Sequence, residues 1–259
     1  MTYLKPIIDF VTDFKDTADD NGELSMIDSV VATDAPQAIL QMAMEKFGAD
    51  IALASSFSME DVVCIDMMME INPRARIFAL DTGRLNEETY ACAEKIRHKY
   101  DCNIEWFFPE NDSVQELIRS KGLYSFKESI EERRQCCFIR KVEPLKRALS
   151  GLHAWVTGQR REQSNTRSNL QIVEIDAMHN NIAKINPLTF WTAQQVRDYV
   201  ELRHIPYNTL YDQGYQSIGC SPCTRASALG EDERSGRWWW ESAEHKECGL
   251  HLTNYAPPA

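Results

Sequence analysis

The sequence predicts an α/β fold in which a parallel sheet is flanked by helices and followed by an irregular C-terminal segment. Short apolar stretches suited to strands alternate with longer stretches of helical periodicity. This alternation is typical of βαβ units, whose parallel strands need crossover helices. From about residue 206 glycine becomes frequent and three tryptophans follow one another, which predicts irregular structure there. With 259 residues, 43% of them hydrophobic, the chain can bury a substantial core.

The predicted elements begin near residue 34. Asp34 followed by Pro36 is typical of a helix start, and Gly48 is typical of a helix end. The predicted strands cover residues 51–54, 77–80, 104–108 and 154–156, and two further helices are predicted at 60–70 and 87–100. The acidic residues before position 30 predict a helical lead-in to this α/β body.

Composition excludes several classes of protein. The chain has 28 Lys and Arg against 39 Asp and Glu, a net charge of −11, so its overall field repels nucleic acid. Any bound anion must be held by a local cluster of positive groups. No apolar run approaches the roughly 18 residues of a membrane span, and the N-terminus lacks a secretory pattern, so we expect a cytoplasmic protein without a membrane partner. In a reducing compartment its eight cysteines point to metal or redox chemistry.

Three predicted strand ends carry small or basic residues. These are Ser55-Ser56-Phe57-Ser58, Asp81-Thr82-Gly83-Arg84, and Gly158-Gln159-Arg160-Arg161 with Arg167 shortly after. Ligands of open parallel sheets bind at the carboxyl ends of the strands, where backbone N–H groups and arginines hold anions. Each stretch alone is also compatible with a helix cap or a solvated basic loop. Their coincidence on one edge favours a phosphate or sulfate site.

Four cysteines form two close pairs. Cys136 and Cys137 are adjacent, and Cys220 and Cys223 form a Cys-x-x-Cys motif. Four thiolates suit zinc or a [4Fe–4S] cluster, and adjacent cysteines point in different directions, which favours the larger cluster over a single ion. Inert buried thiols and a thioredoxin-type redox motif are the competing interpretations.

Cys248 stands apart from these pairs. Lys246 and His251 lie close to it in sequence, and such cationic groups lower a thiol pKa and raise its reactivity. The alternative is an ordinary free cysteine near the end of the chain.

Taken together, these motifs resemble those of the assimilatory adenylylsulfate (APS) reductases, relatives of the phosphoadenylylsulfate (PAPS) reductases, over residues 35–255. The resemblance rests on the three strand-end motifs, the two cysteine pairs and Glu247-Cys248-Gly249-Leu250-His251. Ser58 stands where a glycine is common in that family. The resemblance implies a fold of the adenine nucleotide α-hydrolase (PP-loop) type. Its domains would be an α/β nucleotide-binding domain over 31–205 and a C-terminal segment over 206–259, after a lead-in over 1–30.

The resemblance also implies an activity. APS would be reduced to sulfite and AMP through an S-sulfocysteine on Cys248, with thioredoxin or glutaredoxin as reductant, in sulfate assimilation and cysteine biosynthesis. It places Lys141, Arg234, Arg237 and His251 around the reacting groups and a [4Fe–4S] cluster on Cys136, Cys137, Cys220 and Cys223. The implied substrate-binding residues are Ser55, Ser56, Phe57, Ser58, Asp81, Thr82, Gly83, Arg84, Leu85, Gly158, Arg160, Arg161 and Arg167.

Several alternatives stay open at this stage. The substrate is APS alone, PAPS, or both. A thiolating or adenylating enzyme of the same fold would need no terminal nucleophile, and a non-enzymatic iron–sulfur sensor would leave the strand-end loops unused. The sequence is compatible with a monomer or a homo-oligomer.

Overall fold

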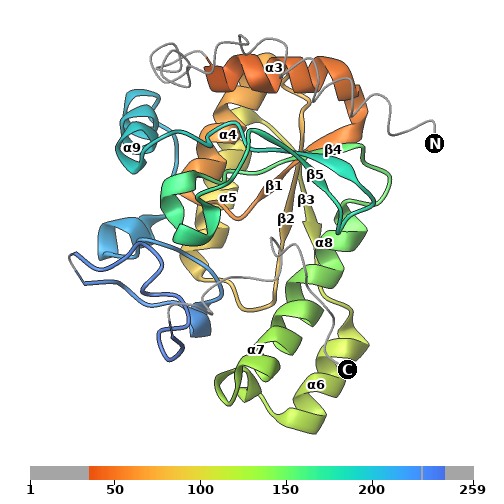
Figure 1. Cartoon of the computed structure of the whole chain (residues 1–259), viewed down its shortest axis with the longest axis vertical. Helices are drawn as coiled ribbons and strands as arrows, with labels where there is room; N and C mark the ends of the chain where they lie inside the picture. Colours follow the sequence, from red (N-terminus) through yellow and green to blue (C-terminus); the bar gives the residue numbers. More distant parts are fainter. Residues whose placement is uncertain (1–34, 229, 243–259) are drawn as a thin grey trace.

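A computed structural model of the chain describes residues 35–228 and 230–242 (Figure 1). Its centre is a six-stranded sheet with the order β3-β2-β1-β4-β6-β5. The strands are β1 (Ile51–Ser55), β2 (Arg76–Leu80), β3 (Ile104–Phe107), β4 (Ala154–Val156), β5 (Val173–Asp176) and β6 (Ile182–Ile185). All neighbouring pairs are parallel except β5 and β6, which are antiparallel. The predicted α/β class is confirmed, with one antiparallel edge strand added.

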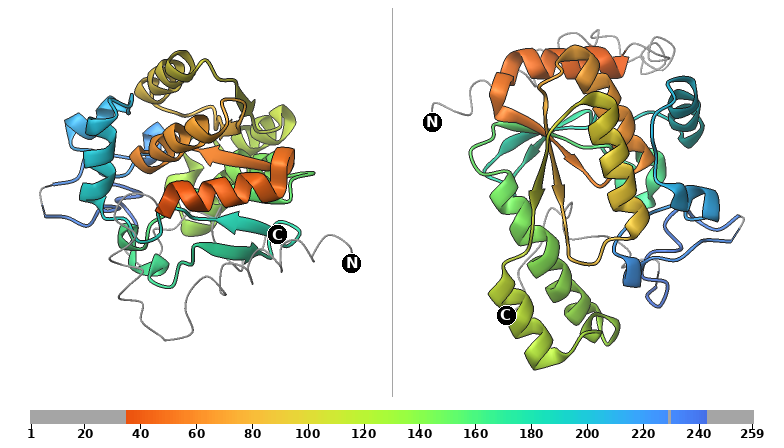
Figure 2. Two further views of the ribbon diagram at one scale, coloured as in Figure 1. Left: turned by 90° about the horizontal axis from the view of Figure 1, so that it is seen from above. Right: turned by 180° about the vertical axis from the view of Figure 1, so that it is seen from behind.

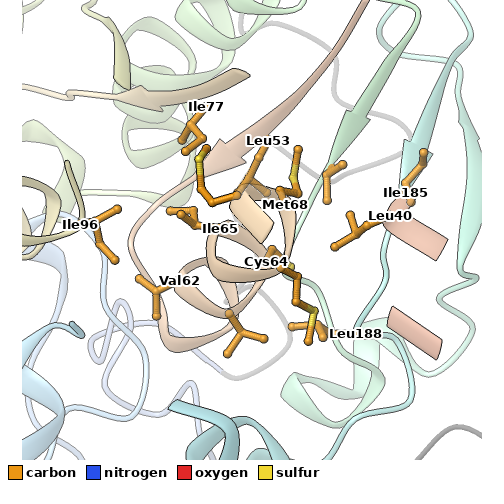
Figure 3. Packing of buried hydrophobic residues seen from close by; sticks show 14 of the residues in the cluster. Leu40, Leu53, Val62, Cys64, Ile65, Met68, Ile77, Ile96, Ile185 and Leu188 are labelled. Atoms are coloured by element: carbon orange, nitrogen blue, oxygen red, sulfur yellow. The ribbon is translucent and has the colours of Figure 1, made fainter. Parts of the chain in front are cut away.

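Helices cover both faces of this sheet (Figure 2). On one face lie α3 (Ala35–Phe47), α4 (Met59–Ile71), α5 (Glu87–Tyr100) and α9 (Ala193–Leu202), and on the other lies α8 (Glu143–Ala148). Successive strand residues alternate between the two faces, so Leu53 joins the larger core while Ala52 joins the smaller one. In the larger core Leu53 and Ile77 of the sheet lie against Ile65 and Met68 of α4 (Figure 3).

The part predicted from periodicity matches the structure closely. The helices α4 and α5 and the strands β1 to β4 each lie within one residue of their predicted bounds. Asp34, the predicted cap, and the lead-in over 1–30 lie outside the described residues. The prediction missed α6 (Asn111–Lys121), α7 (Ile130–Cys137), α8, α9, β5 and β6. Helices α7 and α8 and strands β5 and β6 are short, so hydrophobic periodicity carries little signal there. Helices α6 and α9 are amphipathic, and the prediction overlooked the spacing of their apolar residues.

Helices α6 and α7 extend away from the sheet (Figure 1). A π-helical turn, Phe138–Val142, joins α7 directly to α8. Helix α8 packs under β2 and β3, so this continuous helical stretch connects the cysteine pair at the end of α7 to the sheet. None of the described helices is both long and apolar enough to span a lipid bilayer.

A buried carboxylate joins three helices of the larger face. Asp66 of α4 is 2% exposed. It accepts hydrogen bonds from the hydroxyl of Tyr100 at 2.7 Å, the hydroxyl of Tyr199 at 3.0 Å and Nε of Arg203 at 3.1 Å. Burial and the nearby carboxylate raise the pKa of both tyrosines, which keeps them protonated as donors. Asp66 thus holds α5 and α9 against α4.

We predict that Asp66→Ala destabilises the fold by about 1–3 kcal/mol, because two half-buried tyrosine hydroxyls and the exposed guanidinium of Arg203 lose their shared acceptor. Chemical denaturation monitored by circular dichroism measures this change. The control is Asp198→Ala, since Asp198 is exposed on α9 and is bonded only within that helix to Gln194. Equal stability of the two variants would contradict a role for Asp66 in joining the helices.

Candidate active site

The chain reverses its direction of travel across the sheet between β1 and β4. From β1 it builds outward to β2 and β3, then returns to place β4 on the other side of β1. The crevice outside the carboxyl ends of two such strands is the usual ligand site of an open α/β sheet. A cavity of about 210 Å³ lies there. Its walls come from the loops after β1, β2 and β4 and from the C-terminal segment.

The loop after β1 forms one wall with its backbone. Ser55, Ser56, Phe57 and Ser58 all line the cavity. Phe57 has φ of 58°, in the left-handed region that non-glycine residues rarely adopt. Both the N–H and the hydroxyl of Ser56 donate to Oδ2 of Asp61 at 2.7 Å, and Ser58 caps α4 by accepting the N–H of Asp61 at 3.2 Å. The loop therefore delivers the N-terminal end of α4 to the cavity, where the helix dipole favours an anion.

The loop after β4 approaches α4 so closely that it needs a glycine. A Cβ built on Gly158 would lie 2.5 Å from Oδ1 of Asp61 and 2.8 Å from Cβ of Glu60. Gln159 follows it in the cavity wall and is 5% exposed. Its side-chain oxygen has no hydrogen-bond partner among the described residues. Sequence reasoning did not select Gln159, since only the fold shows that this residue lines the cavity with its side-chain oxygen unpaired among the described residues.

The loop after β2 connects the cavity to the cysteines. Thr82 and Leu85 line the cavity, and the hydroxyl of Thr82 lies 3.2 Å from Sγ of Cys220 in a hydrogen bond. Asp81 and Gly83 lie just outside the cavity wall. Asp81 accepts the N–H of Gly83 at 2.7 Å and the hydroxyl of Tyr90 at 3.0 Å, which fixes the shape of the turn.

Four of the predicted cations line the same cavity: Lys141, Arg167, Arg234 and Arg237. Lys141 lies on the π-helical turn, where the wider backbone replaces the single α-helical turn expected between it and Cys137. Arg237 is 6% exposed, donates to the carbonyl of Ile218 at 3.2 Å and stacks on Trp238 at 4.7 Å. Because Gly219 has no side chain, the Arg237 guanidinium can lie against its backbone.

Three predicted arginines lie elsewhere in the structure. Arg84 donates to the carbonyl of Leu123 at 2.7 Å and stacks on Phe126, while Arg161 donates to the carbonyl of Leu170 at 2.8 Å and stacks on Phe190. Arg160 is 1% exposed and pairs with Glu60. None of the three lines the cavity.

Three carboxyl groups share the cavity with the cations: Glu60, Asp61 and Glu233. Burial raises the pKa of Asp61, partly offset by the hydrogen bonds from Ser56. Burial and the neighbouring Glu60 raise the pKa of Glu233 to about 7, although Arg160 opposes the shift. Sequence reasoning did not select these acids, because their position depends on contacts between distant parts of the chain.

The four paired cysteines lie in one buried cluster. Cys136, Cys137, Cys220 and Cys223 pack together with Leu117, Phe126 and Trp238, although the pairs are more than 80 residues apart in sequence. Burial raises the pKa of Cys223 to about 12, while Lys141 and Arg237 oppose that shift. Among the described residues no three Cys, His, Asp or Glu side chains are arranged to hold a single metal ion. Cys248 and His251 lie outside the described residues.

Comparison with known proteins identifies relatives over most of the chain. The family model described as the phosphoadenosine phosphosulfate reductase domain matches residues 50–226. An adenosine 5'-phosphosulfate reductase of Pseudomonas aeruginosa is 44% identical over 90% of this chain and 88% of its own length. One of Burkholderia cepacia is 48% identical over 80% of this chain and 82% of its own length.

A solved structure shares the fold. The phosphoadenylyl-sulfate reductase of Candida auris, in its phosphate complex, superimposes with a TM-score of 0.64 at 26% identity. It covers 78% of this chain and 96% of its own. This likeness confirms the predicted fold class.

We predict that Gly158→Ala destabilises the protein by about 1–3 kcal/mol, because the added methyl group overlaps Asp61 and Glu60. The clash includes the backbone N of Asp61, so a side-chain rotation alone does not relieve it. Thermal denaturation measures the loss. Ser150→Ala, in the exposed turn before the same strand, is the control. A Gly158→Ala protein as stable as the control would show that the loop and α4 are not in close contact.

Proposed function

The chain belongs to the phosphoadenosine phosphosulfate reductase family, and we propose that it reduces adenylyl sulfate (APS) to sulfite and AMP. The observation that carries this proposal is the cavity at the ends of β1 and β4. It gathers four cations beside a buried cluster of four cysteines. The bacterial relatives described as adenosine 5'-phosphosulfate reductases support the choice of substrate.

The cavity has chemistry suited to each part of APS. Lys141, Arg234 and Arg237 offer positive charge for the phosphosulfate group, and Arg167 adds to it. The start of α4 adds the positive end of its helix dipole. The N–H groups of Ser56, Met59 and Asp61 bond to protein acceptors, so the side-chain cations carry most of the anion binding. Phe57, Phe78 and Trp106 offer apolar and aromatic surface for the adenine.

The cysteine cluster fits a [4Fe–4S] group. Cys136, Cys137, Cys220 and Cys223 supply four buried sulfur donors, and the Thr82 hydroxyl is bonded to the Cys220 sulfur. Burial raises the pKa of Cys136, while Arg140, Arg84 and Lys141 oppose that shift and so lower the cost of the thiolate that ligation requires. When bound, such a group adds charge that tunes the electrostatics of the neighbouring cavity. The two electrons of the reaction come from elsewhere, as set out below.

The first step transfers the sulfonyl group to Cys248. The Cys248 thiolate attacks the sulfur of APS, an S–S bond forms, and the bond between that sulfur and the bridging oxygen breaks. AMP leaves with this oxygen on its phosphate. Because the nucleophile and the substrate are both anions, Lys141, Arg234 and Arg237 reduce their repulsion and stabilise the charge that develops on the leaving phosphate. His251 adds a further donor from the tail.

The second step releases sulfite. A thiolate of reduced thioredoxin, or of glutaredoxin, attacks the Cys248 sulfur, the S–S bond to the sulfonyl group breaks, and sulfite departs with the bonding electron pair. The second thiol of the reductant then resolves the mixed disulfide and restores Cys248. The reductant is oxidised to its disulfide, so it supplies both electrons. This chemistry serves sulfate assimilation toward cysteine.

We predict that incubation with APS and no reductant leaves a sulfite adduct on Cys248, because nothing then removes the sulfonyl group. Peptide mass spectrometry locates the adduct, with PAPS tested side by side to define specificity. Cys248→Ser gives no adduct and no sulfite release. An adduct on Cys220 or Cys223 would overturn the assignment of the nucleophile.

We also predict that Lys141→Ala slows adduct formation about 100-fold, because a cation aimed at the developing charge is removed. Anaerobically purified protein should hold about four irons per chain, and the variant should retain them. Rapid-quench mass spectrometry and iron analysis measure the two quantities. Lys146→Ala, an exposed lysine on α8, is the matched control. A parallel fall in iron content would assign Lys141 to the cluster instead.

A further inference from the structure

The buried guanidinium of Arg160 joins three distant parts of the chain. Its Nε and Nη2 lie 2.8 and 2.7 Å from Oε1 of Glu60, at the start of α4. Nη2 also lies 3.4 Å from Oε2 of Glu233, in the C-terminal segment, and Nη1 lies 3.4 Å from the carbonyl of Trp191. The side chain is 1% exposed, so these protein acceptors take up its donors.

Glu233 opens the short stretch that carries two cavity arginines. At the far end this stretch is held by backbone bonds, because Arg225 donates to the carbonyl of Gly236 and Trp238 donates to the carbonyl of Cys223, both at 3.0 Å. At the near end the contact between Glu233 and Arg160 holds it against the body of the fold. Arg234 and Arg237 lie between these two points.

We propose that Glu233 and Arg160 act as positioning residues that hold Arg234 and Arg237 in place over the cavity. This inference rests on the proposed function, since it assigns those two arginines to the substrate. Arg160 thereby has a role different from the direct substrate contact that the sequence predicts. The carboxylate of Glu233 is the part of the pair that faces the cavity.

The pair is sensitive to pH near neutrality. Glu60, Arg160, Arg167 and Tyr211 are the titratable or charged groups that act on Glu233. Burial and Glu60 raise its pKa to about 7. Glu233 is therefore neutral below that pH and pairs fully with Arg160 only above it. Positioning by this pair strengthens as pH rises through 7.

A positioning role and a purely electrostatic role predict opposite effects. If Glu233 acted only as a negative charge beside an anionic substrate, its removal would tighten binding. If it holds the two arginines in place, its removal weakens binding although a repulsive charge is lost. Protonation of Glu233 at low pH also removes its charge, so it would tighten APS binding under the electrostatic role and weaken it under the positioning role.

The test measures the affinity of the iron-loaded Cys248→Ser protein for APS by calorimetry between pH 6 and pH 8. This background binds without turnover, so thiolate chemistry does not affect the result. We expect Glu233→Gln to weaken APS binding about tenfold at pH 8, the loss typical of a charged hydrogen bond. We also expect the parent affinity to rise with pH through 7 relative to that of the variant, in which the remaining pH dependence comes from other groups such as His251.

Glu162→Gln is the matched control, because Glu162 lies 3.6 Å from the same Arg160 but is exposed and does not line the cavity. It should bind like the parent. Unchanged or tighter binding by Glu233→Gln, the same pH dependence in parent and variant, or an equal loss in the control would each overturn the inference. If Glu233→Gln folds poorly, Glu233→Asp takes its place, because it keeps the charge but shortens the reach to Arg160, and it should also weaken binding at pH 8. Parent protein that does not bind APS at any pH overturns the proposed function itself.

Discussion

The parallel pairing of β1 with β4 is the constraint on which the site depends. Leu53 pairs with Val156, so the two strands end side by side and their loops leave the sheet at the same place. Gly158 then lies against the first turn of α4, close enough that a methyl group would not fit. This contact brings residues about 100 positions apart in sequence onto one cavity. The cations, the helix N-terminus and the C-terminal segment are all arranged around it.

Much of this arrangement was predictable because it rests on local signals. Strand β1 is an apolar run that ends in small polar residues. Helix α5 begins and ends where the helical spacing of its apolar residues begins and ends. The expected spacing of one α-helical turn between Cys137 and Lys141 was less accurate, because a π-helical turn is wider and holds more residues per turn. Helix α6 is polar overall, but its few apolar residues are spaced for one face, so its amphipathic pattern was a local signal that the prediction overlooked.

The arginines show why site residues are harder to predict than strands. Arg160, Arg161 and Arg167 come from one basic stretch, yet only Arg167 lines the cavity. Arg160 is buried in an ion pair with Glu60, which the β1–β4 contact places beside it. Arg161 instead stacks on Phe190. A guanidinium bonds to the acceptors that the fold brings near it. The sequence shows the charge but not the acceptor, and so it cannot separate substrate-facing arginines from structural ones.

The cavity and the cysteine cluster share a wall, and that sharing explains why positive charge accumulates at their boundary. Thr82 lines the cavity and is bonded to the sulfur of Cys220, while Lys141 and Arg237 line the cavity and act electrostatically on Cys223. In the proposed function, ligating thiolates on one side and a phosphosulfate on the other would both be anionic, so cations placed between them would stabilise both. In a protein with a net charge of −11, this local concentration of cations offsets the negative overall field at the cavity. The buried ion pair between Glu60 and Arg160 adds to this effect. Arg160 neutralises the Glu60 carboxylate, which would otherwise weaken the positive field of the cavity.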